Sequence, residues 1–250
     1  MTREEKRLRA AIVAKCLAMN AAGLSPGTAG NISARFGDAM LITPGSVPYD
    51  LLRPEMIAAM PIEGEYGAWS GPLKPSSEWR FHLDILRART DVGAIVHNHA
   101  PYCTALATLH RPIRAAHYMI AQFGGPVVVC TPYAPFGTKE LSDLAVAGLG
   151  ERQAVLLGNH GAVAVGPDLD VALHRALELE SLARVYYLAL AIGEPQILSD
   201  EEMARIVERF KDYSVGAETR KALAPAQRRG AKPKPAKAKA KRGGRRKTAR

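Results

Sequence analysis

The sequence predicts an α/β protein in which helices pack against a sheet. Short runs of aliphatic and β-branched residues, at 94–96, 127–129 and 154–157, have the length and composition of buried strands. Longer segments, at 2–22 and 169–192, have the pattern of helices. Because the two kinds of segment alternate along the chain, the helices are expected to cover the sheet.

The N-terminal third is expected to carry one helix followed by antiparallel strands. The helix starts with a capping-box sequence at Thr2 to Glu5 and stops at Gly23. The glycine-rich loop after it could expose N–H groups to an anion, although the same sequence also suits a plain turn. The expected elements are a helix over 2–22, this loop over 27–31, strands over 32–36 and 40–43, and further short antiparallel strands within 54–71.

The rest of the chain alternates helices with buried strands. One helix opens at Pro75, with Ser76 and Ser77 as its expected N-caps and Glu78 in its first turn. The expected elements are this helix, a strand over 94–96, a helix from about 102, a strand over 127–129, a helix over 141–149 capped by Thr138, a strand over 154–157, a helix over 169–192 and a short helix over 201–210.

Three histidines lie where predicted strands end. His97 and His99 follow the run at 94–96, and because strand side chains alternate faces they project the same way, with Cα atoms about 6.5 Å apart. His160 follows a second run and precedes Gly161, which permits a close approach. Three imidazoles with a fourth position open are typical of a catalytic zinc, although a His-x-His pair also occurs as plain polar residues at a strand end.

The start of the helix at Ser76 is a candidate anion site. Free N–H groups, two hydroxyl groups and the positive end of the helix dipole all favour a phosphate there. Glu78 follows in the same turn, where it is either a functional carboxylate or an ordinary acid favoured by the dipole.

The positive charge is concentrated at the C-terminal end. The formal net charge is +10, but residues 228–250 carry twelve Lys and Arg and no Asp or Glu, which leaves the rest of the chain at −2. We expect 1–218 to be one domain and 219–250 a disordered Lys/Arg/Ala/Pro-rich tail with little apolar surface to bury. The tail suits nonspecific contact with nucleic acid or another polyanion, or is a solvated extension without a role.

The cysteines and the hydropathy favour a cytoplasmic protein. The three cysteines are far apart and odd in number, which argues against a disulfide framework. No segment approaches the roughly 18 apolar residues of a membrane helix, so no membrane partner is expected. The polar N-terminus is unlike a secretory signal.

Seven short motifs resemble those of the class II aldolase/adducin family. They occur in the family's order, and the resemblance extends from about residue 5 to Tyr213, with the L-fuculose-1-phosphate aldolases as the most similar branch. The motifs are GTAGNISAR at 27–35, ITP at 42–44, PSSEWRFH at 75–82, VHNHA at 96–100, HYMIA at 117–121, APFGT at 134–138 and NHG at 159–161.

The resemblance implies a fold, an assembly and a reaction. The implied fold is a single three-layer domain with a mostly antiparallel central sheet flanked by helices, and the implied assembly is a homotetramer with its sites at subunit interfaces. The implied reaction uses zinc or another divalent metal. It cleaves a ketose 1-phosphate such as L-fuculose 1-phosphate reversibly to dihydroxyacetone phosphate and an aldehyde such as lactaldehyde.

The matching motifs also imply residue roles. His97, His99 and His160 are expected to hold the metal, and Glu78 to act as acid and base and, without substrate, as a fourth ligand. Tyr118 is expected to reach the aldehyde oxygen from the neighbouring subunit, with a half-buried core tyrosine as the alternative. The expected phosphate-binding residues are Gly30, Asn31, Gly45, Ser46, Ser76 and Ser77, and the expected aromatic residues of the aldehyde pocket are Phe136 and Tyr213.

The chain departs from the family at Gly45-Ser46, because the aldolases carry a hydroxyl residue before the glycine there. The departure leaves the placement of the phosphate donors and the substrate preference open. Four other histidines have no partner at ligand spacing and are expected to be capped or surface imidazoles. They are His82, His110, His117 and His174.

Two alternatives stay open within the resemblance. A pentulose-5-phosphate 4-epimerase, or another sugar-phosphate aldolase or dehydratase, would share the bond cleavage. The epimerases, however, place an aspartate in the loop that corresponds to 113–130, which has no acidic residue here. A non-catalytic, adducin-like interaction module would have a decayed metal site, whereas the three histidines and Glu78 are all present.

Overall fold

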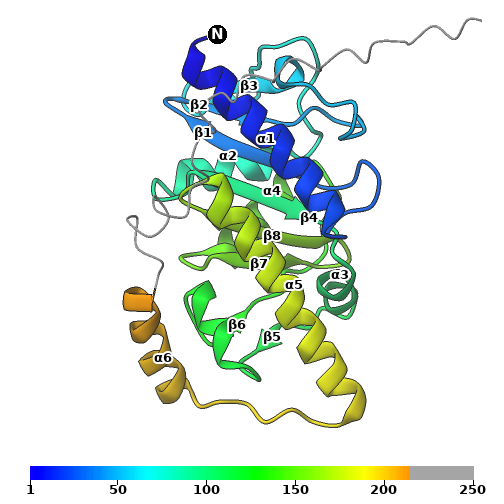
Figure 1. Ribbon diagram of the computed structural model, residues 1–250. Helices are drawn as coiled ribbons and strands as arrows, with labels where there is room; N and C mark the ends of the chain where they lie inside the picture. The colour runs from blue at the N-terminus through cyan, green and yellow to red at the C-terminus, as the bar shows by residue number, and fades with distance from the viewer. Residues whose placement is uncertain (214–250) are drawn as a thin grey trace, which may run out of the picture. The chain divides into compact units, whose positions relative to one another are not determined.

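A six-stranded antiparallel sheet forms the centre of the fold (Figure 1). The structure, a computed structural model, describes residues 1–213 and the side chains of residues 1–210. The strand order is β3-β2-β1-β4-β8-β7, and β5 and β6 form a separate antiparallel pair. The strands are β1 (Asn31–Phe36), β2 (Ala39–Ile42), β3 (Ala58–Pro61), β4 (Ala94–Asn98), β5 (Ile113–Arg114), β6 (Val127–Val128), β7 (Ala154–Leu157) and β8 (Gly161–Gly166).

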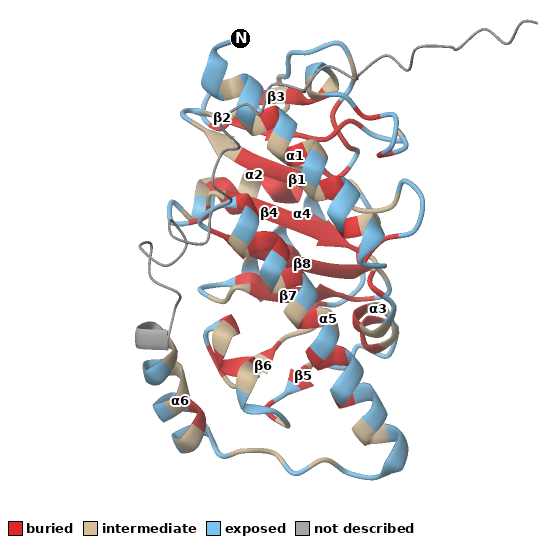
Figure 2. Cartoon of the chain, in the orientation of Figure 1, coloured by how far each residue is buried: buried red, intermediate tan, exposed pale blue. Residues whose placement is uncertain are grey.

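Helices cover both faces of this sheet, which gives the predicted three layers. Ile12 of α1 and Val96 of β4 belong to one buried cluster, whereas Phe81 of α2 and Ile95 of β4 belong to another on the opposite face. The strands between these clusters are almost entirely buried (Figure 2). The helices are α1 (Arg3–Ala21), α2 (Trp79–Ala88), α3 (Pro101–Thr108), α4 (Lys139–Leu149), α5 (Leu169–Ile192) and α6 (Asp200–Tyr213), with 3-10 turns η1 (Pro54–Met56) and η2 (Tyr118–Phe123).

The sheet carries polar residues toward α2 at one place. On β1, Asn31 and Ser33 make hydrogen bonds with the α2 residue His82, while Ile32 between them packs into the core on the opposite face. Asn31 is also the direct cross-strand partner of His97 on β4. Alternation of side chains along both strands therefore brings these polar groups together beneath α2.

Most of the predicted elements are present, and strands β5 and β8 were missed. The structure has the predicted helix at the N-terminus, where Thr2 Oγ1 accepts a hydrogen bond from Glu5 N (3.1 Å). It also has strands β4 and β7 where the histidine-bearing runs predicted them. The sequence analysis did not predict β5 or β8. Strand β8 (GAVAVG) has only two β-branched residues, Val163 and Val165, set among alanines and flanked by glycines, which weakens its strand signal.

The start of α2 differs from the prediction. The helix begins at Trp79 with Glu78 at the N-cap, so neither Ser76 nor Ser77 caps it. Ser76 Oγ instead accepts a hydrogen bond from Glu78 N (3.3 Å), and Ser76 N donates to Thr43 O (2.9 Å). The serine loop is thus tied to the end of β2, and Glu78 leaves it just before the helix starts.

The C-terminal predictions fall outside the described residues. These are the domain boundary at 218 and the basic tail over 219–250. Within residues 1–213, no helix combines the length and the apolar character needed to cross a bilayer.

Candidate active site

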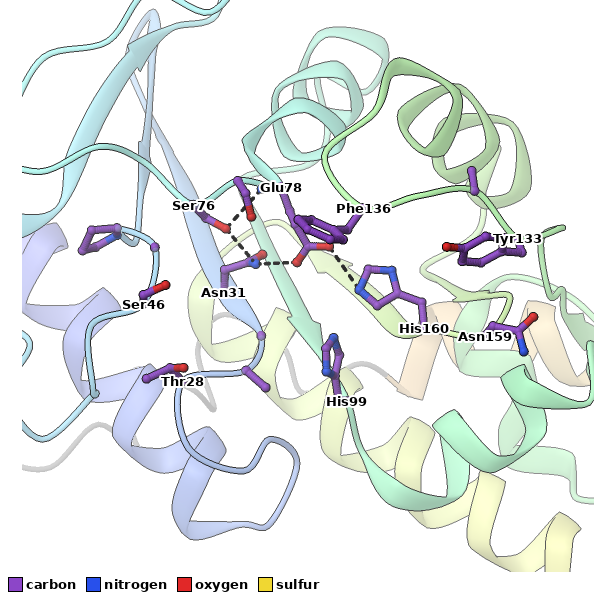
Figure 3. Close-up of a pocket in the computed structure, with 16 residues that line it drawn as sticks. Thr28, Asn31, Ser46, Ser76, Glu78, His99, Tyr133, Phe136, Asn159 and His160 are labelled. Atoms are coloured by element: carbon purple, nitrogen blue, oxygen red, sulfur yellow. Dashed lines mark hydrogen bonds and ion pairs between the residues drawn. The ribbon is translucent and has the colours of Figure 1, made fainter.

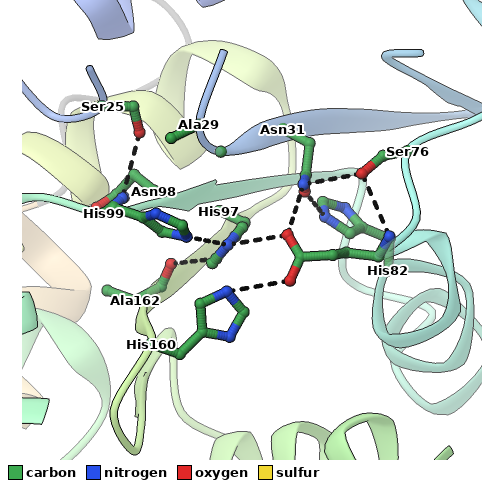
Figure 4. A network of polar contacts seen from close by, with 12 residues as sticks. Ser25, Ala29, Asn31, Ser76, His82, His97, Asn98, His99, His160 and Ala162 are labelled. Atoms are coloured by element: carbon green, nitrogen blue, oxygen red, sulfur yellow. Dashed lines mark hydrogen bonds and ion pairs between the residues drawn. The ribbon is translucent and has the colours of Figure 1, made fainter. Parts of the chain in front are cut away.

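Three histidine side chains converge at the end of β4 (Figure 4). His97 and His99 leave this strand on the same side, and His160 comes from the turn between β7 and β8. The ring centroids lie 4.8 to 5.0 Å apart, and one ligand nitrogen of each ring lies within 4.8 Å of the other two. The three residues selected from the sequence are therefore close enough to share one ion.

The turn that carries His160 depends on a glycine. A Cβ atom at Gly161 would lie 2.4 Å from Asn98 O and 2.9 Å from His99 Cδ2, which is too close for any other residue. Asn159, on the other side of His160, has a φ of 53°, a conformation that asparagine adopts more readily than most residues. These two positions allow the turn to approach β4.

The orientation of His97 leaves a lone pair facing the other two rings. Its Nδ1 lies 3.0 Å from Ala162 O, and because a carbonyl oxygen only accepts, Nδ1 must donate. In the neutral ring, Nε2 then carries a lone pair, and it lies 3.1 Å from His99 Nε2. Burial lowers the pKa of His99 to about 4, so the His99 ring is uncharged near neutral pH. The donor type, the spacing and the carbonyl behind His97 fit a divalent ion such as zinc.

Glu78 is buried against the histidines with its carboxylate between them and Asn31. Oε1 lies 3.1 Å from His160 Nε2, and Oε2 lies 3.2 Å from His97 Nε2. Oε2 also accepts a hydrogen bond from Asn31 Nδ2 (2.9 Å). Burial raises the pKa of Glu78, but His97 and His160, when protonated, outweigh it through their charge and hydrogen bonds and hold the pKa below its usual range. The carboxyl group is therefore ionised and can accept a proton.

These groups face a pocket of about 400 Å³ (Figure 3). Figure 3 shows Glu78, His99 and His160 in the middle of the pocket, with Ser46 to one side and Tyr133 to the other. The residues that line it are Thr28, Ala29, Gly30, Asn31, Pro44, Gly45, Ser46, Ser76, Ser77, Glu78, His99, Tyr133, Ala134, Phe136, Asn159 and His160.

The six residues expected at the phosphate all line this pocket. Asn31 Nδ2 donates to Ser76 Oγ (3.0 Å), which joins the glycine-rich loop to the serine loop. Gly30 has a φ of 78°, and a Cβ atom there would lie 2.6 Å from His97 O, so the position requires glycine. Ser46 also has a positive φ of 60°. Together these loops present hydroxyl and backbone groups on one side of the pocket, as an anion site requires.

The aromatic residues selected from the sequence are dispersed. Phe136 lines the pocket and is 71% exposed. Tyr118 lies outside the pocket lining, is 52% exposed and stacks on His117. Its predicted contact from a neighbouring subunit stays a prediction. The side chain of Tyr213 lies outside the described residues. Tyr133 also lines the pocket and was not predicted. The one sequence feature that could have indicated it is its position three residues before Phe136.

His82 is the clearest correction. It was expected to be a capped or surface imidazole, yet it is fully buried and bonded to Ser33 Oγ (2.8 Å) and Asn31 Oδ1 (2.5 Å). The available signal was its position four residues after Glu78, which places the two side chains on neighbouring turns near the start of α2. Its partners on β1 could not be identified from that spacing.

Comparison with known proteins identifies relatives over most of the chain. A family model described as Class II Aldolase and Adducin N-terminal domain matches residues 10–187. A 5-methylthioribulose-1-phosphate/5-deoxyribulose-1-phosphate aldolase of Rhodospirillum rubrum is 52% identical and aligns over 78% of this chain and 87% of that protein. An L-fuculose phosphate aldolase of Escherichia coli O6:H1 is 47% identical over 86% of this chain and 99% of that protein. A solved structure of L-fuculose 1-phosphate aldolase superposes with a TM-score of 0.79 at 36% identity, over 84% of this chain and 98% of that one.

Proposed function

This chain belongs to the class II aldolase and adducin family, and from that premise we propose that it cleaves a ketose 1-phosphate reversibly into dihydroxyacetone phosphate and an aldehyde. The relatives named as aldolases make the chain an aldehyde-lyase of this family. The observation that carries the proposed reaction is the convergence of His97, His99 and His160 beside the buried Glu78. It argues against the non-catalytic, adducin-like alternative.

The three histidines would hold the metal. When bound there, Zn²⁺ or another divalent ion would supply a Lewis acid that stabilises the negative charge left by cleavage of the C3–C4 bond. His97 would be held in the required tautomer by Ala162 O. Gly161 would allow His160 to complete the trio.

Glu78 would move the proton. In cleavage it would accept the proton of the C4 hydroxyl group while the aldehyde carbonyl forms, and would then return this proton to C3 to give dihydroxyacetone phosphate. In condensation the same two transfers would run in reverse, with the proton taken from dihydroxyacetone phosphate and passed to the aldehyde oxygen. Its depressed pKa keeps it ionised at neutral pH, ready to act as the base. Without substrate, the same carboxylate is close enough to the histidines to serve as a fourth ligand.

The two sides of the pocket would bind the two ends of the substrate. Gly30, Asn31, Gly45, Ser46, Ser76 and Ser77 would bind the phosphate through hydroxyl, amide and backbone groups. Phe136 and Tyr133 would contact the aldehyde end. Tyr118 would donate to the aldehyde oxygen from the neighbouring subunit of a homotetramer, and Tyr213 would complete the apolar wall.

The apolar character of the aldehyde side favours substrates with an apolar end. L-Fuculose 1-phosphate, which yields lactaldehyde, is the first candidate because of the relatives in Escherichia coli. A 5-deoxy or 5-methylthio pentulose 1-phosphate is the second, because the more similar relative in Rhodospirillum rubrum is named for these substrates. A pentulose-5-phosphate 4-epimerase is the remaining alternative within the family.

An assay of dihydroxyacetone phosphate release tests the reaction. The purified protein, loaded with Zn²⁺ and separately with other divalent ions, would be given the three ketose 1-phosphates and ribulose 5-phosphate. We expect release from at least one ketose 1-phosphate, and a loss of about 10²- to 10⁴-fold in kcat for Glu78→Gln because the base is removed. Conversion of ribulose 5-phosphate to xylulose 5-phosphate without aldehyde would establish the epimerase instead.

The basic segment 219–250 is proposed as a separate polyanion-binding extension of a cytoplasmic enzyme. The twelve Lys and Arg of residues 228–250 would contact phosphates without sequence preference, and binding would weaken steeply with salt. A variant truncated after residue 218 is expected to keep full aldolase activity and to lose RNA binding. Equal RNA binding by both proteins would remove this proposal.

A further inference from the structure

A chain of buried polar groups extends from β1 through α2 to the pocket (Figure 4). It begins at Ser33 and His82, both fully buried, and continues through Asn31, which is 3% exposed. From Asn31 it divides to Ser76 and Glu78, which line the pocket. Ser33 and His82 are not part of the pocket lining, so neither can touch a substrate there.

The direction of each hydrogen bond follows from the chemistry at the pocket end. Asn31 Nδ2 donates to Glu78 Oε2 at 2.9 Å. The same nitrogen lies 3.0 Å from Ser76 Oγ, so both of its protons are used. Asn31 Oδ1 therefore faces His82 Nε2 at 2.5 Å. Because Oδ1 has no proton, His82 Nε2 must donate.

The other side of the His82 ring is fixed in the same way. Burial lowers the pKa of His82 to about 3, so the ring is neutral and carries one proton, which is on Nε2. Nδ1 is then an acceptor, and Ser33 Oγ at 2.8 Å donates to it. Once Asn31 Nδ2 donates to Glu78, each later hydrogen bond in this sequence has only one direction.

The orientation of the Asn31 amide determines what the Ser76 hydroxyl group can do. Its Oγ accepts from Asn31 Nδ2 (3.0 Å) and from Glu78 N (3.3 Å), which occupies both lone pairs. The hydroxyl proton of Ser76 is thus the one part of the group still available, and the side chain lines the pocket. A hydroxyl group that can only donate suits a phosphate oxygen and not a cation or a second donor.

We propose that His82 is a positioning residue that fixes the orientation of the Asn31 side-chain amide. Ser33 holds His82 in its Nε2–H tautomer, and the fixed amide directs the Ser76 hydroxyl proton into the pocket and holds Glu78 Oε2 in place by a hydrogen bond. If the Asn31 amide turned over, its oxygen would face the Glu78 carboxylate and its nitrogen would face the proton on His82 Nε2. Both contacts would be repulsive, so the tautomer of His82 excludes that state. The expected effect of His82 on catalysis depends on the proposed aldolase function, whereas its expected effect on phosphate binding does not.

Two pairs of variants test the proposal kinetically and by anion binding. His82→Leu removes both hydrogen bonds of the ring, whereas His82→Gln offers a donor and an acceptor of similar reach. Ser33→Ala removes the donor to Nδ1. Its matched control is Ser142→Ala, because Ser142 is also fully buried and donates to Asp84 Oδ2 (2.6 Å) outside the pocket. The measurements are kcat and KM for the cleaved ketose 1-phosphate and the affinity for inorganic phosphate by calorimetry.

The proposal expects effects typical of residues behind a reacting group. His82→Leu should lower kcat/KM and phosphate affinity by about 10- to 100-fold, Ser33→Ala by about 10-fold, and His82→Gln should recover most of the loss. Ser142→Ala should stay within about twofold of wild type in both measurements. Losses in His82→Leu and Ser33→Ala no larger than in Ser142→Ala at equal thermal stability would overturn the proposal, as would His82→Gln behaving like His82→Leu.

Nitrogen NMR of the imidazole groups tests the tautomer without any variant activity. In ¹⁵N-histidine-labelled wild-type protein, one ring signal pair, assigned by its loss in His82→Gln, should report protonated Nε2 and bare Nδ1 from pH 5 to 8. Protonated Nδ1, or titration in that range, would overturn the proposal. If wild type cleaves no ketose 1-phosphate, the proposed function fails, and phosphate affinity and the NMR signal still decide whether His82 positions Asn31.

Discussion

The two halves of the pocket are built differently. Around the histidines, His97 and Glu78 are buried, at 0% and 7% exposure, and are bonded to partners on β1, β4 and β8. On the aldehyde side, Phe136 and Tyr133 are 71% and 56% exposed and lie on a loop. The sheet therefore holds the groups proposed to react in fixed positions, whereas the exposed aromatic residues on the loop are free to contact a substrate or a second subunit.

The largest loss of activity is expected when a histidine is removed from the buried half of the pocket, the side formed by the three histidines and Glu78. His99→Ala should lower kcat/KM by about 10³-fold or more and lower the bound metal, because a Lewis acid worth several kcal/mol would be lost. The measurements are steady-state kinetics and metal analysis. His174→Ala, which changes an exposed histidine on α5, should leave both unchanged. Full metal content and turnover in His99→Ala would contradict the account of the buried half.

A change to the backbone should be nearly as damaging as a change to a functional side chain. Gly161→Ala introduces a Cβ atom 2.4 Å from Asn98 O, so the turn must move and carry His160 away from β4. We expect a loss of about 1–3 kcal/mol in the free energy of unfolding and of metal affinity. Gly193→Ala is the control, because nothing lies within 4 Å of a Cβ atom there. Equal behaviour of the two variants in urea denaturation would show that close approach is not required.

The buried half should also respond to acid. The pKa of His82 is lowered by burial from 6.5 to about 3, so below pH 6.5 the unfolded chain takes up a proton that the folded protein refuses. The stability linked to His82 is complete above pH 6.5 and falls as the pH drops toward 3, by at most about 1.4 kcal/mol per pH unit.

Urea midpoints between pH 7 and pH 5 measure this dependence. Glutamine at position 82 cannot titrate, so the urea midpoint of His82→Gln should fall less steeply with decreasing pH than that of wild type. The difference between the two slopes gives the contribution of His82 apart from that of the carboxyl groups and the other histidines. Identical slopes would mean that the burial of this ring carries no proton linkage.

The smallest effect is expected on the open half. Phe136→Ala should raise KM by less than about 10-fold and leave kcat and stability nearly unchanged, because most of the ring is exposed. The change should be larger for a substrate with a bulky apolar end than for a small one. A loss of kcat comparable to that of Glu78→Gln would show that the two halves are not as separate as their burial indicates.

The sequence was most informative where function depends on local periodicity. The histidines of β4 were predictable because alternation along a strand puts positions 97 and 99 on one side. It was least informative where the partners are distant in the chain. His82 was misassigned because Ser33 and Asn31 lie on a different strand, and the helix start was misplaced because Ser76 bonds to Thr43 and Asn31 instead of capping α2.

The exposed side of the pocket could not be fully predicted from a single sequence. Tyr118 was predicted to act from a neighbouring subunit, and no pattern within a single sequence encodes the distance between two copies of it. Strand β8 was missed for a different reason: its two valines, Val163 and Val165, are separated by small alanines and flanked by glycines, and its pairing with β4 and β7 cannot be read from that short pattern.

The pairing of Asn31 with His97 across β1 and β4 has a consequence for how the protein folds. The two strands are remote in the chain, so this contact closes a long loop and is expected to form late. A slip by one residue would turn both side chains away from each other. The three imidazoles themselves are brought together by the pairing of β4 with β8, so a divalent cation could bind all three only in molecules with that register, and its binding would stabilise the correctly paired sheet.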